Sequence, residues 1–127
     1  MPERTEIPNG PEAPAAARAF VRSAAARLPG QLIDDACLLV SELVTNSHKH
    51  AGMPQGSPIQ VTFDLSGDRL RLEVVDHSIF DPTPESTKEL REGRWGLTLV
   101  DRIAWRWGRH SEGGVWVELP YASESQR

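Results

Sequence analysis

The feature that most constrains the fold is a pair of alternating stretches on either side of Ser66-Gly67-Asp68. In both stretches every second residue is apolar: Ile59, Val61, Phe63, Leu65, Leu70, Leu72 and Val74. A period of two is typical of strands with one buried face, and the short polar turn predicts that they pair as a β-hairpin. The apolar face of a hairpin has to be covered, so other parts of the chain must supply a second layer.

Helical periodicity precedes the hairpin and can supply that layer. Apolar residues recur at helical spacing from about Pro11 to Leu28, and proline is tolerated in a first helical turn. Leu28-Pro29-Gly30 is expected to end this helix. A second helix is expected from about Gln31 to Ala51, with Cys37 as a small buried residue in its apolar stripe.

The remaining elements complete an α+β domain. The pattern predicts an edge strand at Thr5–Ile7, an irregular segment at 77–93, a helix at Trp95–Trp105 and a final hairpin from Trp107–His110 and Val115–Leu119. This order predicts a two-layer α/β sandwich, with helices on one face of a mostly antiparallel mixed sheet. We expect an extended N-terminal segment at 1–10, one domain at 11–120 and a polar tail at 121–127.

Composition narrows the class of protein. A chain of 127 residues with 39% hydrophobic residues fits one folded domain. No apolar run approaches the ~20 residues that span a bilayer, and the first residues lack the pattern of a signal peptide. We therefore expect a cytoplasmic protein that does not contact a membrane. A single cysteine excludes an internal disulfide framework.

The charge distribution argues against direct binding to DNA. The formal net charge is -4, and no extended basic tract is present to form the electrostatic footprint of a duplex binder. Arg102, Arg106 and Arg109 form a local basic cluster near the end of the third predicted helix. A solvated face and charge complementarity to the helix C-terminus explain this cluster adequately.

A polar stripe on the second helix is the first candidate for a site. Glu42, Asn46 and His50 recur every four residues and so lie on nearly the same face of the helix. The Glu42 carboxylate could act as general base on a hydroxyl or water. Asn46 offers a neutral oxygen to a hard cation such as Mg²⁺, and His50 could donate to phosphate. On the helix alone, an ordinary solvated face is the simpler interpretation.

Two later stretches make a site more specific. Asp76 ends a buried strand ahead of the long loop, where its carboxylate could accept hydrogen bonds from an amino-bearing ring such as adenine. Glu92-Gly93-Arg94-Trp95-Gly96-Leu97 places two glycines at a helix start, where free N–H groups and the helix dipole favour phosphate. Each feature alone is weak evidence, because a loop-capping aspartate is common. In this order and on these elements, the three features together indicate a Mg²⁺–phosphate site.

These motifs resemble the GHKL (histidine kinase-like) ATPase superfamily, which includes DNA gyrase and sensor histidine kinases. Leu39–Asn46 with His50-Ala51 is similar to the N box of that superfamily, and Gly93–Leu97 is similar to its second glycine box. Val115–Pro120 is similar to its closing strand. The resemblance covers almost the whole chain. Within the superfamily the chain most resembles the small single-domain branch of anti-sigma-factor serine/threonine kinases.

The resemblance implies a Bergerat-type ATP-binding fold with ATP and Mg²⁺ as cofactors. It implies that Glu42 is the general base, that Asn46 is the Mg²⁺ ligand and that His50 lies near the phosphates or ribose. Asp76 would read the adenine amino group. The phosphates would be cradled under a lid around Pro82–Glu92 by Gly93, Arg94, Trp95, Gly96 and Leu97.

The same resemblance implies partners. Kinases of this branch transfer a phosphoryl group to a serine or threonine of a STAS-type antagonist protein. They also sequester a sigma factor, typically as a homodimer. We therefore expect these two classes of protein, and a second copy of the chain, as partners.

The chain departs from the superfamily pattern around the adenine pocket. The first glycine box usually reads Asp-x-Gly-x-Gly, whereas this chain has Asp76-His-Ser78-Ile-Phe80, so Ser78 stands at a nucleotide-binding glycine position. A threonine usually precedes the closing strand, where this chain has Glu112-Gly-Gly114. Two functions therefore stay open. One is an ATP-dependent serine/threonine kinase and anti-sigma factor. The other is a non-enzymatic anti-sigma or antagonist-binding module with a degenerate nucleotide pocket.

Overall fold

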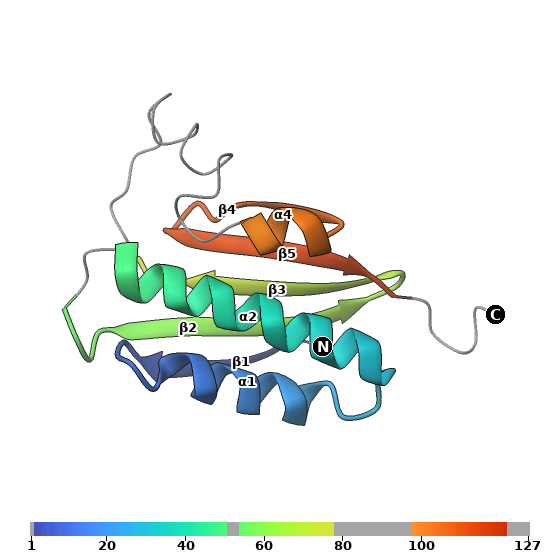
Figure 1. Cartoon of the computed structure of the whole chain (residues 1–127), viewed down its shortest axis with the longest axis horizontal. Coiled ribbons are helices and arrows are strands. Elements are labelled where there is room, and N and C mark those ends of the chain that lie inside the picture. Colours follow the sequence, from blue (N-terminus) through green and yellow to red (C-terminus); the bar gives the residue numbers. More distant parts are fainter. Residues whose placement is uncertain (1, 51–53, 78–97, 122–127) are drawn as a thin grey trace.

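The computed structural model describes residues 2–50, 54–77 and 98–121. They form two layers, an antiparallel sheet and a group of helices on one of its faces (Figure 1). The predicted two-layer α/β sandwich is confirmed, but each described strand pair is antiparallel, so the described sheet is not mixed as predicted. None of the described helices is long and apolar enough to cross a bilayer.

The helix layer consists of α1 (Ala13–Ala24), α2 (Gly30–His50) and α4 (Thr98–Ile103). α1 is rich in alanine, which has the highest helix propensity, and its proline lies in the first turn, where a backbone N–H is not needed. The buried residues of α1 are four apart and so form one face: Ala13, Ala17 and Val21. α2 begins one residue before the expected Gln31 and ends one residue before the expected Ala51.

The other two helices end earlier than their sequence patterns predict. α1 ends at Ala24 rather than near Leu28, and the Leu28 N–H then donates to the Ala25 carbonyl at 2.9 Å in a turn. Proline disfavours helical backbone at the preceding residue, so Pro29 keeps Leu28 out of the helix. α4 ends at Ile103 because the Trp105 N–H donates instead to the Glu118 carbonyl of the sheet, at 2.8 Å. Residues 95–97 of this predicted helix lie outside the described residues.

The described sheet has five strands in the order β1-β2-β3-β5-β4. They are β1 (Glu3–Pro8), β2 (Pro58–Ser66), β3 (Arg69–Val75), β4 (Arg106–Arg109) and β5 (Gly114–Pro120). Both predicted hairpins form, and the predicted edge strand pairs with β2 through Ile7 opposite Ile59. Because β5 lies between β3 and β4, the end of β3 is brought beside the β4–β5 turn.

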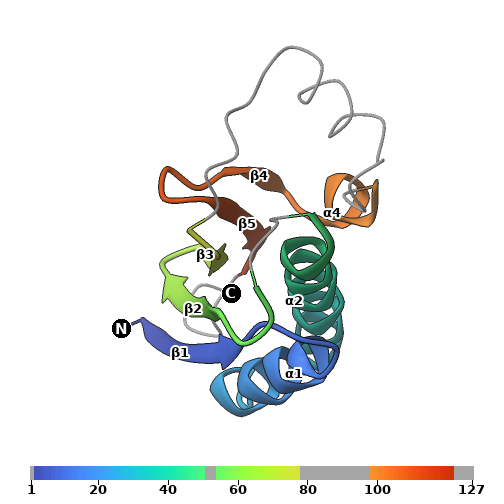
Figure 2. The ribbon, with the colours of Figure 1, turned by 90° about the vertical axis from the view of Figure 1, so that its left-hand side faces the viewer.

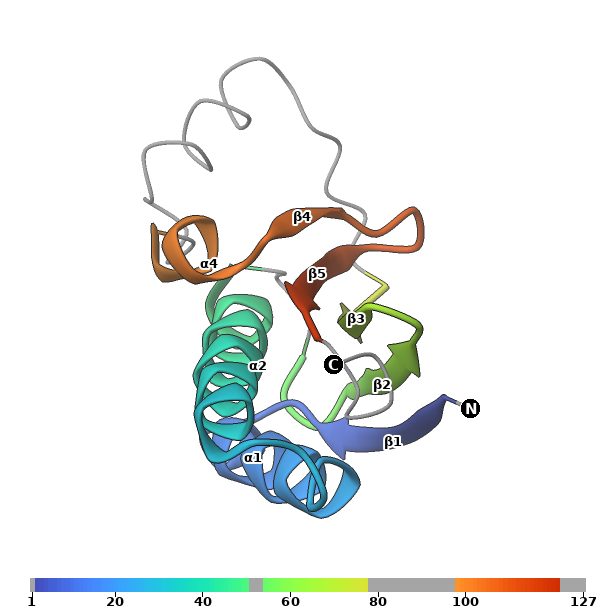
Figure 3. The same cartoon turned by 90° about the vertical axis from the view of Figure 1, so that its right-hand side faces the viewer.

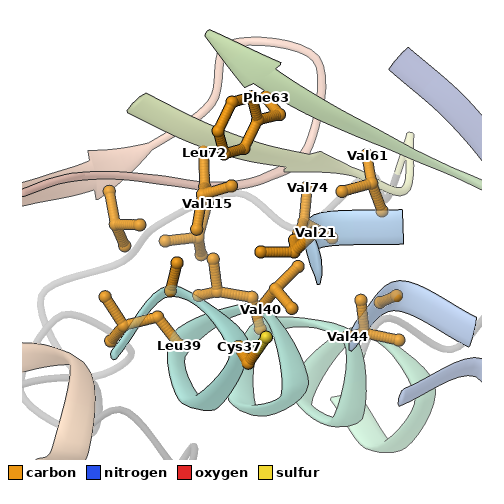
Figure 4. Close-up of a cluster of buried hydrophobic side chains, with 14 of the residues drawn as sticks. Val21, Cys37, Leu39, Val40, Val44, Val61, Phe63, Leu72, Val74 and Val115 are labelled. Atoms are coloured by element: carbon orange, nitrogen blue, oxygen red, sulfur yellow. The ribbon is translucent and has the colours of Figure 1, made fainter. Parts of the chain in front are cut away.

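The core fills the space between the sheet and the helices (Figure 4). The largest fully buried side chains are Leu39, Leu43, Ile59, Leu70, Leu72, Val21, Val40, Val44, Val61, Val74 and Val100. Burial of one such side chain stabilises a fold by roughly 1.5–3 kcal/mol. Cys37 lies in this core as predicted, and burial raises the pKa of its thiol, so the thiol stays protonated at neutral pH.

The helices cover one face of the sheet only, as Figures 2 and 3 show from the two ends. Of the predicted basic cluster, only Arg102 belongs to a helix, so charge complementarity to a helix end applies to Arg102 alone. Arg102 lies in α4, but Arg106 and Arg109 lie in β4. Two strand positions that are three apart point to opposite faces of the sheet, so Arg106 and Arg109 lie on different faces.

Candidate functional site

The candidate site begins where α2 meets the end of β3. The hydroxyl of Ser47 donates a hydrogen bond to the carboxylate of Asp76, with 2.7 Å between Oγ and Oδ2. Both residues are only 5% exposed. Because Asn46 is the neighbour of Ser47, the hydrogen bond brings the polar stripe of α2 and the predicted adenine-reading aspartate to the same end of the core.

The backbone around Asp76 is fixed by the turn between β4 and β5. The Asp76 N–H donates to the Gly113 carbonyl at 3.1 Å, and Val75 pairs with Gly114. Gly114 has φ +114°, and a Cβ at this position would overlap the carbonyl oxygen of Val74. Only glycine fits such a close backbone approach. Gly114, in the segment that replaces the usual threonine of the superfamily, is therefore required by the way β3 and β5 meet.

Arg109 adds a positive charge beside Asp76. It pairs with Val115, whose side chain belongs to the core, so Arg109 lies on the helix-facing side of the sheet. Burial lowers the pKa of Arg109, and the Asp76 carboxylate opposes this by raising it. An ionised carboxylate has about four acceptor positions. The hydroxyl of Ser47 occupies one of them.

Asn46 carries the feature that best fits a metal ion. Its Oδ1 atom is buried and accepts no hydrogen bond from the described part of the chain. Such an unsatisfied buried oxygen costs about 1–3 kcal/mol unless it acquires a partner. A neutral amide oxygen is a ligand that Mg²⁺ accepts alongside water and phosphate oxygens, so Asn46 fits the predicted role. Glu42, one helical turn earlier on α2, is half-buried and within reach of solvent.

A model of the histidine kinase-like ATPase domain matches residues 7–120 of the chain. The protein belongs to this family. Among proteins of curated function, none matches the chain. The match confirms the predicted superfamily and supports ATP as the ligand. The match does not identify the anti-sigma kinase branch, which stays a prediction.

Part of the predicted site of this histidine kinase-like domain lies outside the described residues. This applies to Ser78, to the whole second glycine box and to the side chain of His50, although the backbone of His50 ends α2. The glycine-box residues concerned are Gly93, Arg94, Trp95, Gly96 and Leu97. Their roles toward phosphate stay predictions. The described half of the site consists of Glu42, Asn46 and Asp76.

Sequence reasoning missed two residues of this histidine kinase-like site, Ser47 and Arg109. Ser47 follows Val40 and Leu43 at helical spacing, so it occupies a position of the buried stripe of α2. A serine at such a position needs a buried partner, and this was the available signal. Arg109 gave no comparable signal, because its approach to Asp76 depends on β5 lying between β3 and β4.

Ser47→Ala is expected to lower the free energy of unfolding by about 1.5–3 kcal/mol, because the buried Asp76 carboxylate loses a hydrogen-bond donor. Urea unfolding measures the change. Ser23→Ala is the matched control, since Ser23 is exposed on α1. If both variants lose equally little stability, the hydrogen bond does not support the site as we describe it.

The stability of the fold is expected to depend on whether the side chain at position 77 is branched at its Cβ atom. His77 has φ 56° and is exposed, so a substitution there tests backbone conformation with little effect on packing. His77→Asn should be tolerated, whereas the β-branched His77→Val should lose about 1–2 kcal/mol, because β-branched residues resist this conformation more than histidine, asparagine and aspartate do. Urea unfolding of the two variants measures the difference. Equal stabilities would contradict a left-handed conformation directly after Asp76.

Proposed function

We propose that this histidine kinase-like domain is an ATP- and Mg²⁺-binding serine/threonine kinase and anti-sigma factor of a partner-switching system. The observation that carries the proposal is the buried, unpartnered Oδ1 of Asn46 in the described structure. It lies one helical turn from Glu42 and next to the Ser47–Asp76 hydrogen bond. A metal ligand, a base and a reader of adenine thus come from two adjacent elements.

The reaction needs few protein groups, because phosphoryl transfer depends mainly on positioning and electrostatics. Asn46 would hold Mg²⁺, which supplies neutralising charge to the phosphates when it is bound. Glu42 would take the proton from the attacking serine hydroxyl of the partner. The hydroxyl oxygen then bonds to the γ-phosphorus, and the bond to the bridging oxygen breaks, so ADP leaves. Glu42 and Asn46 lie about 6 Å apart along the helix axis, which leaves room for both groups.

Asp76 supports adenine as the base. Its carboxylate is held by Ser47 and its backbone by Gly113, so the acceptor oxygens keep one orientation. The amino group of adenine can donate to such an acceptor. Guanine presents a carbonyl oxygen at the same ring position, which a carboxylate repels. We therefore expect ATP to bind in preference to GTP.

Phosphoryl transfer to a protein substrate tests the proposal. The domain is incubated with γ-labelled ATP, Mg²⁺ and a STAS-type antagonist protein that carries an exposed serine. We expect label on that serine, and none when the Mg²⁺ is removed with a chelator. Transfer to a STAS-type protein identifies the antagonist class. The kinase proposal is contradicted if the domain binds both ATP and the STAS-type protein but transfers no label.

A second candidate function is favoured by the residues around Asp76. Ser78 and Phe80 stand where the first glycine box of the superfamily has glycines, and Glu112-Gly-Gly114 stands where it usually has a threonine. A non-enzymatic anti-sigma or antagonist-binding module would keep the fold and its partners without turnover. It predicts that partner binding is the same with and without ATP. The sigma factor, the STAS-type antagonist, the homodimer and the cytoplasmic location are part of both proposals.

A further inference from the structure

The face of the sheet away from the helices carries arginine and tryptophan side chains from β3, β4 and β5, and Trp105 directly before β4 adjoins them. We call this group the Arg–Trp cluster, and it consists of Arg69, Arg71, Glu73, Trp105, Arg106, Trp116 and Glu118. Side chains alternate between the two faces of a strand, so the strand members of the cluster lie opposite the buried Leu70, Leu72 and Val117. Trp105 joins them through its contact with Arg106. Figures 2 and 3 show no described helix over this face.

Glu118 organises the cluster. Its side chain is only 4% exposed, although it lies on the face without helices, because arginines surround it. Its Oε2 atom is 3.2 Å from Arg71 and 3.4 Å from Arg69, and its Oε1 atom is 3.3 Å from Arg106. The three guanidinium groups are themselves partly exposed. One buried carboxylate therefore fixes three arginines at the surface.

Two tryptophans give the cluster flat apolar surfaces. The guanidinium of Arg71 lies 4.4 Å from the ring centre of Trp116, and that of Arg106 lies 4.2 Å from the ring centre of Trp105. A Cβ at Gly108 would lie 2.9 Å from the indole of Trp116, so the glycine makes room for that ring. Trp105 is 49% exposed. The cluster therefore presents planar cations next to aromatic rings.

The charges of the cluster do not balance. Three guanidinium groups face the two carboxylates of Glu118 and Glu73, and Glu73 is also 2.9 Å from the imidazole of His110. The arginines thus exceed the carboxylates of the cluster by one, although Asp64 lies opposite Arg71 on the same face of the sheet. Each guanidinium has five N–H donors in a planar arrangement that matches carboxylates. The donors that Glu118 does not use can bind further carboxylates.

We propose that the Arg–Trp cluster is a docking surface for an acidic segment of a partner protein, with carboxylates beside an apolar residue. Tryptophan and arginine are the residues most enriched among those that dominate binding energy in protein interfaces. Nucleic acid is the less suitable occupant, because it needs an extended basic footprint, whereas the cluster holds three arginines. The surface lies on the opposite side of the sheet from the nucleotide site, so the inference does not rest on the proposed function.

Indole signals in nuclear magnetic resonance spectra test this surface. The ¹⁵N-labelled protein is titrated at low salt with a short peptide of glutamate and leucine, and separately with its glutamine–leucine counterpart. We expect the acidic peptide alone to shift the indole N–H signals of Trp105 and Trp116. Trp107 is an internal control, because its indole N–H donates to Asp101 of α4 at 3.1 Å.

Two variants connect the shifts to the cluster. The double variant Arg69→Gln with Arg106→Gln should bind the acidic peptide at least about fivefold more weakly, while Arg71 keeps Glu118 paired. Arg27→Gln is the matched control, since Arg27 is exposed beyond the end of α1. Trp105→Ala should also weaken binding, and it serves if the double variant does not fold.

Three outcomes would overturn the proposal. One is the absence of indole shifts up to millimolar acidic peptide. Another is an affinity for the acidic peptide that is unchanged both in Trp105→Ala and in the folded double variant. The third is tighter binding of a single-stranded oligonucleotide than of the acidic peptide, which would assign the surface to nucleic acid.

Discussion

Glu42→Gln is expected to lower the rate of phosphoryl transfer by about 10²- to 10⁴-fold, which is the usual contribution of a general base. Glutamine keeps the shape of glutamate but does not accept a proton. Glu42 lies half-buried on α2, one turn before the Asn46 that fits the metal ion. The affinity for ATP with Mg²⁺ should stay nearly unchanged, because the base acts in the transition state.

Single-turnover transfer from ATP to the partner serine measures this rate, and calorimetry measures the affinity. Glu6→Gln removes an exposed carboxylate on β1 and is the matched control. It should transfer at the rate of the unmodified protein. Transfer at an unchanged rate in Glu42→Gln would remove Glu42 from the role of base, whereas loss of ATP affinity would make Glu42 a binding residue.

Asn46→Ala is expected to separate stability from function. Without Mg²⁺, the variant should be about 1–3 kcal/mol more stable than the unmodified protein, because it loses a buried oxygen without a partner in the described structure. The same change should weaken Mg²⁺-dependent ATP binding more than about 100-fold, since even the loss of an outer-shell group costs 10- to 100-fold. Few substitutions of a buried polar residue are expected to stabilise a fold.

Urea unfolding in a chelator and calorimetric titration with ATP measure the two effects of Asn46→Ala. Thr45→Ala is the matched control. It gains a similar amount of helix propensity on the same turn of α2 but keeps the Oδ1 atom of Asn46. The gain in Asn46→Ala should exceed the gain in Thr45→Ala. A variant that is less stable than the unmodified protein and binds ATP equally well would make Asn46 an ordinary structural residue.

The sequence was sufficient to predict the elements whose structure depends on the local pattern of residues. The alternation at Ile59–Val74 predicted both strands and their buried face, and helical spacing predicted α2 within one residue at each end. The predicted end of α4 was wrong because another part of the chain competes there, whereas α1 ends ahead of a local turn before Pro29. The backbone of Trp105, for example, bonds to Glu118 of β5, which no helical pattern around Trp105 can indicate.

The candidate site shows the same division. Glu42, Asn46 and Asp76 were predicted because their spacing and their places on α2 and at the end of β3 can be read locally. The contacts that hold Asp76 could not be predicted, since Ser47 and Gly113 reach it only through the packing of α2 and the strand order. The Arg–Trp cluster was also missed, because Arg69, Arg106 and Glu118 come from three different strands.

The most direct test of the central claim is calorimetric titration of the whole chain with ATP, with Mg²⁺ and without it. We predict saturable binding of one ATP per chain that requires Mg²⁺, exceeds the binding of GTP and is lost in Asn46→Ala. Absence of binding up to millimolar ATP, with Mg²⁺ present and the protein shown to be folded, would contradict an ATP–Mg²⁺ site formed by α2 and Asp76.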